Sequence, residues 1–313
     1  MTDHAFHVVD VFTDRPFGGN PLAVFPDARG IPESLFQAIA REFNLSETTF
    51  VLPPEDQANH CKVRIFTPAA ELPMAGHPTV GTAFVLVREG ILDPSASGGV
   101  LRFEEGVGLV PVTVEPGPRG SRDPGRITMS QPLPRFGPVF DDREAIAALL
   151  GLKPGDLLSG APVQSVSCGV PFCLVPLRSL DAVARANLQT ALWERALKAW
   201  VANAVLVFSR ETDSPGHHVH ARMFAPAFGV QEDPATGSAA GPLGCYLIHH
   251  GLVDSPAGVG DVDLVCEQGV EMGRPSLLNI GLSLDTESSN AGGITGVRVG
   301  GHAVPVSRGV MHL

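Results

Sequence analysis

Runs of apolar residues divide the first fifth of the chain into short strands and one helix. Residues 6–13 and 22–25 are rich in Val, Phe and Leu and flank a turn that contains Gly and Asn, which predicts a β-hairpin. Apolar positions recur at helical spacing over 32–42 and predict an amphipathic helix. Two further runs of β-branched and aromatic residues, 49–52 and 61–66, predict strands.

Two later segments, 79–88 and 239–248, are apolar on nearly every side. This pattern is typical of a helix surrounded by protein, since a helix on a surface keeps one polar face. The longest helical pattern covers 181–203, and 297–306 returns to a strand pattern. The chain therefore combines many strands with two helices that we expect to be buried.

Each buried segment follows a copy of one motif. The copies are Glu71-Leu-Pro-Met-Ala-Gly-His-Pro-Thr79 and Glu232-Asp-Pro-Ala-Thr-Gly-Ser-Ala-Ala240, at an offset of 161 residues (232 − 71). An Arg-x-Phe-x-Pro stretch precedes each copy, starting at Arg64 and Arg222. Hydrophobic strands can resemble one another by chance, but matches at a fixed offset are the signature of a repeat. The motif predicts two similar domains.

The stretch 115–125 is the most linker-like in the chain, because Pro, Gly and charged residues dominate it. A length of 313 residues suits two domains. We therefore expect an N-terminal domain over 1–120 and a C-terminal domain over 126–313, with the last strand able to pack back on the first domain.

Composition narrows the class of partner. Apolar residues make up 44% of the chain, enough for a substantial core, while the net charge of −11 argues against a nucleic acid or an anionic membrane as the main partner. A small molecule is the expected ligand. The five cysteines form no CxxC pair, no signal peptide is evident, and no segment has the apolar length of a membrane span, which together predict a cytoplasmic protein.

The glycine of each motif copy marks a chemically useful position. A strand that turns into a helix at Gly76 or Gly237 leaves unpaired backbone N–H groups at the positive end of the helix dipole, where a carboxylate or enolate oxygen binds well. His77 and Ser238, the next residues, each add a polar side chain. The alternative is that each glycine serves only a tight turn. The paired polar neighbours favour an anion clamp.

Proton transfer needs an acid or base, and Glu47 is one candidate. It lies in Asn44-Leu-Ser-Glu-Thr-Thr-Phe50, directly before a strand pattern, and an offset of 156 places Asn203 at the corresponding position (203 − 47). A carboxylate beside a semi-apolar cleft could both accept and donate a proton. The residues alone equally fit a helix-capping or surface glutamate.

Asp233 is the second acidic candidate, because Leu72 occupies its place in the first motif copy. It could orient His77 or accept a bond from a substrate amine or hydroxyl. A turn residue before Pro234 is an equally good interpretation of the sequence.

Several long motifs in order resemble the PhzF family, the phenazine-biosynthesis-type isomerases related to diaminopimelate epimerase. The resemblance covers almost the whole chain, and its motifs are Asp10-Val-Phe, Gly19-Asn-Pro-Leu-Ala-Val24, Asn44 to Phe50, Ala75-Gly-His-Pro-Thr79, Glu232 to Ala239, Gln268-Gly and Gly273-Arg-Pro-Ser276.

The resemblance implies an α+β fold with two pseudo-symmetric domains, each a barrel-like, mainly antiparallel sheet wrapped around a central helix, with the active site between them. It implies that Glu47 is the acid/base and that His77 and Asp233 are the other catalytic residues. The substrate-binding residues would be Asn20, Ser46, Gly76, Gly237 and Ser238. It further implies a homodimer.

The related epimerases carry a cysteine at each helix start, and this chain does not. Ala75 and Thr236 lie near those positions, and Cys245 follows Gly237 by eight residues (245 − 237), about two helical turns too late. The difference argues against racemisation by two thiols. A single carboxylate that moves a proton between carbons of a small carboxylic acid, such as a dihydro-hydroxyanthranilate-type substrate, fits better.

Two alternatives remain open at this point. One is an epimerase or hydro-lyase that acts on a hydroxy or amino acid, and the other is a binding protein that kept the fold without catalysis. The proposed proton chemistry requires no cofactor, and no metal site is expected. For His217-His-Val-His220, the absence of an acidic or cysteine partner at useful spacing favours a polar loop that enters a strand. Arg274 is left out of the site.

Overall fold

The computed structural model describes residues 2–254, 258–285 and 287–313, and its helices and strands form an α+β fold with a large mixed sheet. The chain divides into two compact units, residues 1–130 with 299–313 (unit 1) and residues 131–298 (unit 2). The predicted boundary near 120–126 lies in the connection before the strand at Ile127–Gln131, and the division by contacts follows Ser130.

Unit 1 is built from strands that follow one another across the sheet in the order β18, β1, β2, β3, β4, β6 and β7, with β5 also paired to β4. The pairs β2–β3 and β4–β6 are parallel and the others antiparallel. The bounds are β1 (Asp3–Val11), β2 (Asn20–Phe25), β3 (Glu47–Leu52), β4 (Cys61–Phe66), β5 (Glu71–Leu72), β6 (Val100–Glu105), β7 (Gly108–Val114), β8 (Ile127–Gln131) and β18 (Ala303–His312).

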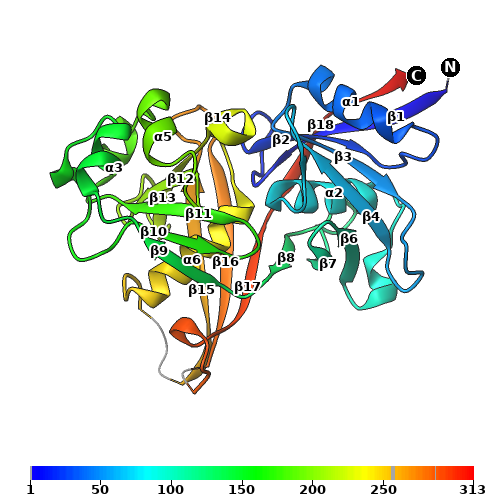
Figure 1. Cartoon of the computed structure of the whole chain (residues 1–313). Coiled ribbons are helices and arrows are strands. Elements are labelled where there is room, and N and C mark those ends of the chain that lie inside the picture. Colours follow the sequence, from blue (N-terminus) through cyan, green and yellow to red (C-terminus); the bar gives the residue numbers. More distant parts are fainter. Residues whose placement is uncertain (1, 255–257, 286) are drawn as a thin grey trace. The chain divides into compact units, whose positions relative to one another are not determined.

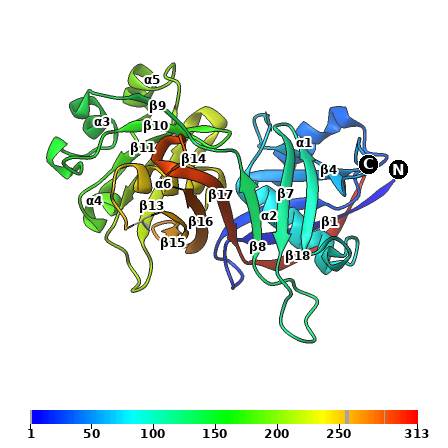
Figure 2. The same cartoon turned by 90° about the horizontal axis from the view of Figure 1, so that it is seen from below.

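The helix α2 (Gly76–Arg88) is the centre of unit 1 and confirms the predicted buried helix. It contacts β1, β2 and β3 as well as β18, the first strand of this order, and β7, which also pairs with β8 (Figures 1 and 2). Gly81 lets the sheet approach the helix closely, because a Cβ there would lie 2.6 Å from Leu22 Cδ2 and 2.7 Å from Val11 Cγ2. The amphipathic helix α1 (Phe36–Phe43), after η1 (Glu33–Leu35), packs outside against β3 and β4.

Unit 2 repeats these pairings strand for strand. Its order is β9, β10, β11, β12, β13, β15 and β16, with β14 also on β13, and the pairs β11–β12 and β13–β15 are parallel. The helix α6 (Gly237–His249) is buried against β10, β11 and β16. The strand bounds are β9 (Arg135–Val139), β10 (Gln164–Ser167), β11 (Pro171–Pro176), β12 (Ala204–Ser209), β13 (Val219–Ala225), β14 (Val230–Asp233), β15 (Val259–Gln268), β16 (Ser276–Asp285) and β17 (Ile294–Gly301).

The long helical pattern over 181–203 is broken in the structure. It forms two short helices, α4 (Leu180–Arg185) and α5 (Thr190–Ala196), beside α3 (Arg143–Leu149). The guanidinium of Arg222 donates to the carbonyls of Val183, Ala184 and Ala186 at 2.7–3.0 Å. The last turn of α4 is therefore capped by a side chain from the strand β13. Short 3₁₀ turns complete the chain at η2 (Pro94–Ser97), η3 (Pro154–Asp156), η4 (Pro226–Phe228) and η5 (Ala291–Gly293).

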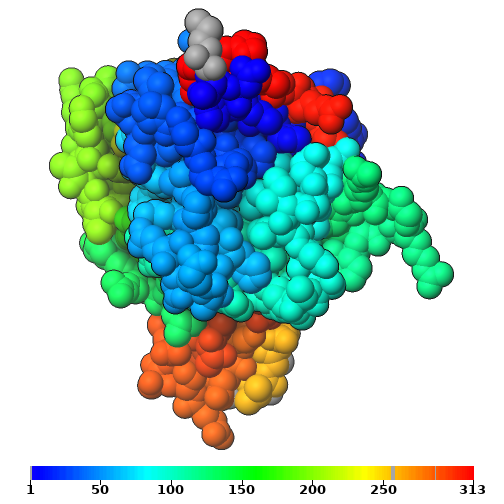
Figure 3. Space-filling model, turned by 90° about the vertical axis from the view of Figure 1, so that its right-hand side faces the viewer, coloured from blue at the N-terminus to red at the C-terminus, as the bar shows by residue number. Residues whose placement is uncertain are grey.

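The strand predicted over 297–306 is two strands, β17 and β18, that separate at His302. The carbonyl of His302 accepts the backbone N–H groups of Phe12 and Thr13. β18 then pairs antiparallel with β1, and the backbone of Thr2 exchanges hydrogen bonds with that of Leu313. Figure 3 shows the resulting contact between the N-terminal strand and the C-terminal segment on the surface of unit 1. The last strand therefore belongs to unit 1.

Candidate active site

The shared pairings give paired strand residues of unit 1 structural counterparts in unit 2. Leu22 of β2 pairs with Glu47 of β3, whereas the matching Phe172 of β11 pairs with Ala204 of β12. The counterpart of Glu47 is therefore Ala204, and the predicted counterpart Asn203 is wrong by one position. Leu72 and Asp233 do correspond. Leu72 pairs with Ile65 of β4, and Asp233 pairs with Met223, the equivalent residue of β13.

Three predicted site residues meet at the beginning of α2. Asn20 opens β2, Glu47 opens β3, and His77 is the second residue of α2. The Nδ2 of Asn20 lies 3.1 Å from His77 Nδ1, and His77 Nε2 lies 3.0 Å from Glu47 Oε2. All three residues are buried. Residues far apart in sequence thus form one polar cluster at a helix start.

The tautomer of His77 follows from the contact with Asn20. An amide NH₂ that donates to Nδ1 leaves the proton of the neutral ring on Nε2, which faces Glu47. Although the two atoms are within ion-pair distance, neither Glu47 Oε2 nor His77 Nε2 makes a hydrogen bond of good geometry to any described residue. Buried polar atoms without a partner are rare in proteins and are typical of sites that bind a ligand.

The first N–H groups of α2 are also available. Ala75, the residue before the helix, provides no side-chain cap, and the backbone N–H groups of Gly76 and His77 donate to no described residue. These donors and the positive helix end favour an anion. Ser46 is half-buried directly before β3 and makes no hydrogen bond to Asn20, Glu47 or His77.

In unit 2 the corresponding helix start is held by a side-chain network. Asp233 ends β14 and is buried, and its Oδ2 accepts a 2.5 Å hydrogen bond from the hydroxyl of Thr236. Gln268 at the end of β15 donates to the Asp233 carbonyl at 2.7 Å and accepts from the backbone N–H of Thr236 at 3.1 Å. The turn before α6 is therefore rigidly defined. Asp233 has a turn contact, as one of the two interpretations of the sequence anticipated.

Gly237 and Ser238 begin α6 as predicted. Their backbone N–H groups donate to no residue in the described part of the chain, and the Ser238 side chain is buried without a hydrogen bond there. The carbonyl of Gly237 accepts a 2.9 Å bond from Gln131 Nε2. A Cβ at Gly241 would lie 2.0 Å from Gln131 Oε1, so this glycine makes room for the glutamine.

Sequence analysis missed a second pair of equivalent residues, Glu105 and Gln268. Cys61 pairs with Phe103 in unit 1, and Val219 pairs with Cys266 in unit 2. Glu105 lies two residues after Phe103, and Gln268 lies two residues after Cys266, so the two are equivalent. Each is followed by a glycine whose Cβ would collide with a proline of the preceding motif. This Glu/Gln-Gly repeat was visible in the sequence at an offset of 163 (268 − 105).

Glu105 is buried at the start of α2. Its Oε1 lies 2.6 Å from the hydroxyl of Thr79, and its Oε2 has no hydrogen-bond partner among the described residues. Burial raises the pKa of Glu105 to about 8, and the Thr79 hydroxyl only partly opposes the shift.

The first glutamate of each motif copy has a structural role. Glu71 forms a bidentate pair with Arg64 at 2.7 and 2.8 Å, and Glu232 forms the same pair with Arg222 at 2.8 and 2.9 Å. Each guanidinium also lies over the phenylalanine two residues later, 5.2 Å from the ring centroid. The Arg-x-Phe repeat therefore stabilises the β-turn-helix unit.

The histidine run is a polar loop that enters β13, as predicted, but the expected absence of acidic partners is wrong. His217 Nδ1 lies 2.6 Å from Glu267, and the two ring nitrogens of His220 lie 2.8 Å from Glu267 and 2.9 Å from Glu271. These partners come from 47 to 51 residues away, which local spacing cannot reveal. Among the described residues no cluster has the arrangement of a metal site.

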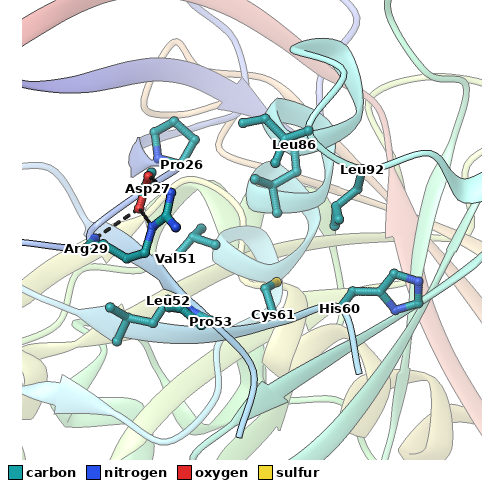
Figure 4. Close-up of a pocket in the computed structure, with 11 residues that line it drawn as sticks. Pro26, Asp27, Arg29, Val51, Leu52, Pro53, His60, Cys61, Leu86 and Leu92 are labelled. Atoms are coloured by element: carbon teal, nitrogen blue, oxygen red, sulfur yellow. Dashed lines mark hydrogen bonds and ion pairs between the residues drawn. The ribbon is translucent and has the colours of Figure 1, made fainter. Parts of the chain in front are cut away.

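A hollow of about 440 Å³ in unit 1 lies at the other end of α2 (Figure 4). Leu86 lines it with Val51, Cys61 and His60, while His77 lies nine residues earlier, about 14 Å along the helix. The hollow is thus separate from the cluster of Asn20, Glu47 and His77. Burial raises the pKa of the Cys61 thiol, so this cysteine is not a reactive thiolate.

Cys245 is buried within α6, its Sγ 4.0 Å from that of Cys168. The hydrogen bond with Cys168, together with burial, raises the pKa of Cys245. Its position in the helix interior agrees with its exclusion as a terminal thiol.

The sequence model of the PhzC-PhzF family, described as phenazine biosynthesis-like protein, matches residues 9–309. The chain belongs to this family. A trans-2,3-dihydro-3-hydroxyanthranilate isomerase of Pseudomonas fluorescens is 36% identical to this PhzC-PhzF protein over 313 residues, covering 99% of this chain and 100% of the relative. An uncharacterized isomerase of Mesorhizobium japonicum is 37% identical over 320 residues, and the match covers 100% of this chain and 100% of the relative.

A crystal structure of a PhzF-family phenazine biosynthesis protein from Bacillus anthracis matches this PhzC-PhzF protein with a TM-score of 0.88 and 28% identity, covering 100% of both chains. The family and the α+β fold predicted from the sequence are confirmed, as is the prediction that the chain is an isomerase. Within the part of the chain that the structure describes, no helix combines the length and the apolar character of a membrane span.

Proposed function

We propose that this chain is a PhzF-like isomerase that moves a proton between two carbons of a small carboxylic acid, with Glu47 as the single acid/base. The observation that carries the proposal is the cluster at the start of α2. There a buried carboxylate oxygen and a buried imidazole nitrogen, 3.0 Å apart, both lack a hydrogen-bond partner among the described residues. Relatives named trans-2,3-dihydro-3-hydroxyanthranilate isomerase support a substrate of that type.

The chemistry follows from the groups present. Glu47 Oε2 takes a proton from one carbon of the substrate, the electron pair of the broken C–H bond moves into the conjugated acid, and the same carboxyl returns the proton to a second carbon. The atoms and charge of the substrate are unchanged overall. His77 Nε2–H and the free N–H groups of Gly76 and His77 are placed to donate to an oxygen on which negative charge develops.

Asn20 positions His77, because its amide NH₂ holds Nδ1 as an acceptor and keeps the proton on Nε2. In unit 2 we propose that Asp233, Gly237 and Ser238 take part in the same reaction, and the rigid turn made by Thr236 and Gln268 supports this role. Ser46 is proposed as a weaker substrate contact. A barrel-like closure of each sheet around its helix is also proposed, supported in unit 1 by the contacts of α2 with both β7 and β18.

The unequal counterparts favour one base over two. Glu47 corresponds to Ala204, which has no ionisable group, and no cysteine begins either helix. A racemase or epimerase with two symmetric bases needs a proton-transferring group on both sides of the reacting carbon. A single carboxylate that shifts a proton along one face of the substrate requires only Glu47.

The proposal is tested by following solvent deuterium with NMR in a screen of small unsaturated carboxylic acids. We expect the parent to convert a substrate and to deliver deuterium, acquired when the Glu47 carboxyl exchanges its proton with solvent, to a carbon different from the one that loses its proton. Glu47→Gln, which keeps the size of the side chain, should abolish both conversion and exchange. Glu42→Gln, the same change at an exposed position on α1, is the matched control and should behave as the parent.

Two results would contradict the proposal. Exchange that persists at the parental rate in Glu47→Gln removes Glu47 as the base. Deuterium found only at an inverted stereocentre, with no bond shift, assigns the chain to epimerisation.

A further inference from the structure

The hydroxyl of Thr79 has more close contacts than it has protons. Its Oγ1 lies 2.7 Å from the carbonyl oxygen of Ala75 and 2.6 Å from Glu105 Oε1. A hydroxyl donates one hydrogen bond, and both a carbonyl and an ionised carboxylate can only accept. One of the two contacts therefore needs a proton from Glu105. A protonated carboxylic acid donates to Thr79 Oγ1, which then donates to the carbonyl of Ala75.

Unit 2 supplies an independent indication of the same state. The counterpart of Glu105 is Gln268, whose neutral amide holds the turn before α6 through Asp233 and Thr236. A protonated glutamic acid and a glutamine have nearly the same shape, and each carries one acceptor oxygen and one donating group. The two units thus place a neutral side chain of the same form behind each helix start.

We propose that Glu105 is a positioning residue that acts as a neutral carboxylic acid, bracing the start of α2 through Thr79 and keeping negative charge away from the end of the helix that binds the substrate anion. Its effect on the substrate rests on the proposed function. Thr79 lies three residues after Gly76, so Glu105 acts through the helix and does not touch the reacting atoms.

The surroundings of Glu105 do not supply a counter-charge that would keep it ionised. Its Oε2 is buried without a hydrogen-bond partner in the described residues. The neighbouring strand β4 contributes the Cys61 thiol, whose pKa is raised by burial, and β7 and η2 contain no ionisable side chain. Glu105 also lines a hollow, and the other charged residues that line it are Glu55, Asp56, Lys62, Arg64, Glu71 and Glu104.

Most of these outer charges are already paired. Lys62 contacts Glu55, and Arg64 binds Glu71, so the two cations of the hollow are engaged away from Glu105. On α2 the other ionisable residues are His77 at the start and Arg88 at the end. The protonation state of Glu105 is therefore set by its burial, which raises its pKa to about 8.

The first test reads the proton directly and needs no substrate. Infrared difference spectra of protein labelled with ¹³C in glutamate are compared for the parent and Glu105→Gln at pH 7. We expect the parent to show the C=O stretch of a protonated carboxylic acid, isotope-shifted, and the variant to lack it. Glu42→Gln should retain the band. A parent spectrum without the band overturns the proposal.

The second test measures unfolding by urea between pH 5 and 9. The folded state holds the Glu105 proton more tightly than the unfolded chain, whose glutamate pKa is about 4.3. The stability of the parent should therefore decline as pH rises from about 4.3 to about 8, and Glu105→Gln should remove that part of the decline. Parallel curves for the parent and the variant overturn the assignment.

The third test concerns the substrate and uses steady-state kinetics from pH 7 to 9.5. Ionisation of Glu105 should raise KM by up to about tenfold per pH unit above pH 8 with a smaller change in kcat, because the added charge opposes anion binding. Glu105→Gln should match the parent at pH 7 and lose the alkaline rise in KM. Thr79→Ser should behave as the parent, whereas Thr79→Val should raise KM at all pH values.

The outcomes separate the two proposals. If the parent shows the infrared band but Glu105→Gln keeps the parental alkaline rise in KM, the positioning role is overturned while the proposed reaction stands. If no substrate is converted by the parent, the proposed function fails, and the infrared and unfolding tests still decide the state of Glu105.

Discussion

The two units share one set of strand pairings and differ in the polar residues around their central helices. In unit 1, Glu47 and His77 lie buried and unsatisfied at the start of α2. In unit 2, the equivalent strand position is Ala204, and the polar groups before α6 are bonded to one another through Gln268. One copy of the duplicated scaffold holds groups ready for a ligand, and the other is a braced turn with free helix N–H groups.

Under the proposed function, this difference gives two similar units a one-sided reaction. The elements that build the scaffold are the same on both sides, as the bidentate pairs of Arg64 with Glu71 and Arg222 with Glu232 illustrate. The proposed catalytic residues Glu47 and Asp233, in contrast, have counterparts of different chemistry, Ala204 and Leu72. Scaffold residues are constrained by packing and hydrogen bonding, whereas site residues are free to diverge.

The largest expected effect comes from giving unit 1 the residue of unit 2. Glu47→Ala should lower kcat by about 10³- to 10⁴-fold, because the only proposed base is lost. The unfolding midpoint should stay the same or rise, since Glu47 Oε2 is a buried oxygen without a hydrogen bond in the described structure. Steady-state kinetics and urea unfolding of the same samples test both parts. Loss of activity with loss of stability would contradict this separation of roles.

The paired arginines should differ in their effect on stability. Arg222→Ala leaves the half-buried Glu232 without its partner and uncaps three carbonyls of the α4 segment, so we expect a loss of about 3 kcal/mol in the free energy of unfolding. Arg64→Ala removes a more exposed pair and should cost about 1 kcal/mol. Chemical unfolding measures both. Equal losses would show that the extra contacts of Arg222 contribute little.

Replacing Asp233 with its unit 1 counterpart tests the other asymmetric position. Asp233→Leu removes the acceptor for the Thr236 hydroxyl, and we expect a loss of about 1–3 kcal/mol in stability and of about 10- to 100-fold in kcat/KM. Asp233→Asn keeps an acceptor and should recover most of the stability. If its kcat/KM recovers in parallel, the role of Asp233 is confined to the turn.

The smallest expected effect concerns His220, which binds Glu267 and Glu271. Burial lowers the pKa of His220, but its two carboxylate partners raise the pKa overall. Burial raises the pKa of Glu267 and of Glu271, but their histidine partners lower both pKa values overall. The histidine contribution is present below about pH 6.5 and is lost as pH rises through its raised pKa, while the glutamate contribution is lost as pH falls below about 4.3.

His220→Gln should therefore destabilise the protein most between about pH 4.5 and 6.5, by about 1 kcal/mol, and less at pH 8. Thermal unfolding at pH 5.5 and 8 measures the difference. His60→Gln in unit 1, whose histidine pKa is lowered by burial and by Arg102, is the control and should not show this loss at pH 5.5. A larger effect at pH 8 than at pH 5.5 for His220→Gln contradicts the assigned charges.

Much of the fold could be predicted from local pattern. The strands of the first hairpin, helix α1 and both buried helices lie where periodicity placed them, and the motif offset predicted the correspondence of Leu72 with Asp233. The prediction failed over 181–203, where the guanidinium of Arg222, a residue of β13, caps the carbonyls at the end of α4. It also misplaced the counterpart of Glu47 by one residue, because strand register is set by pairing and not by similarity.

The sequence by itself determined the family, the duplication and the residues that begin each central helix, since these depend on residue order and on short-range periodicity. Only the tertiary structure decided which side chains meet. Glu47 and His77 come together because β3 lies against the start of α2, and Glu105 reaches Thr79 because β6 ends there. Burial at these meeting points changes the chemistry of each group, and burial is a property of the folded chain that no local pattern contains.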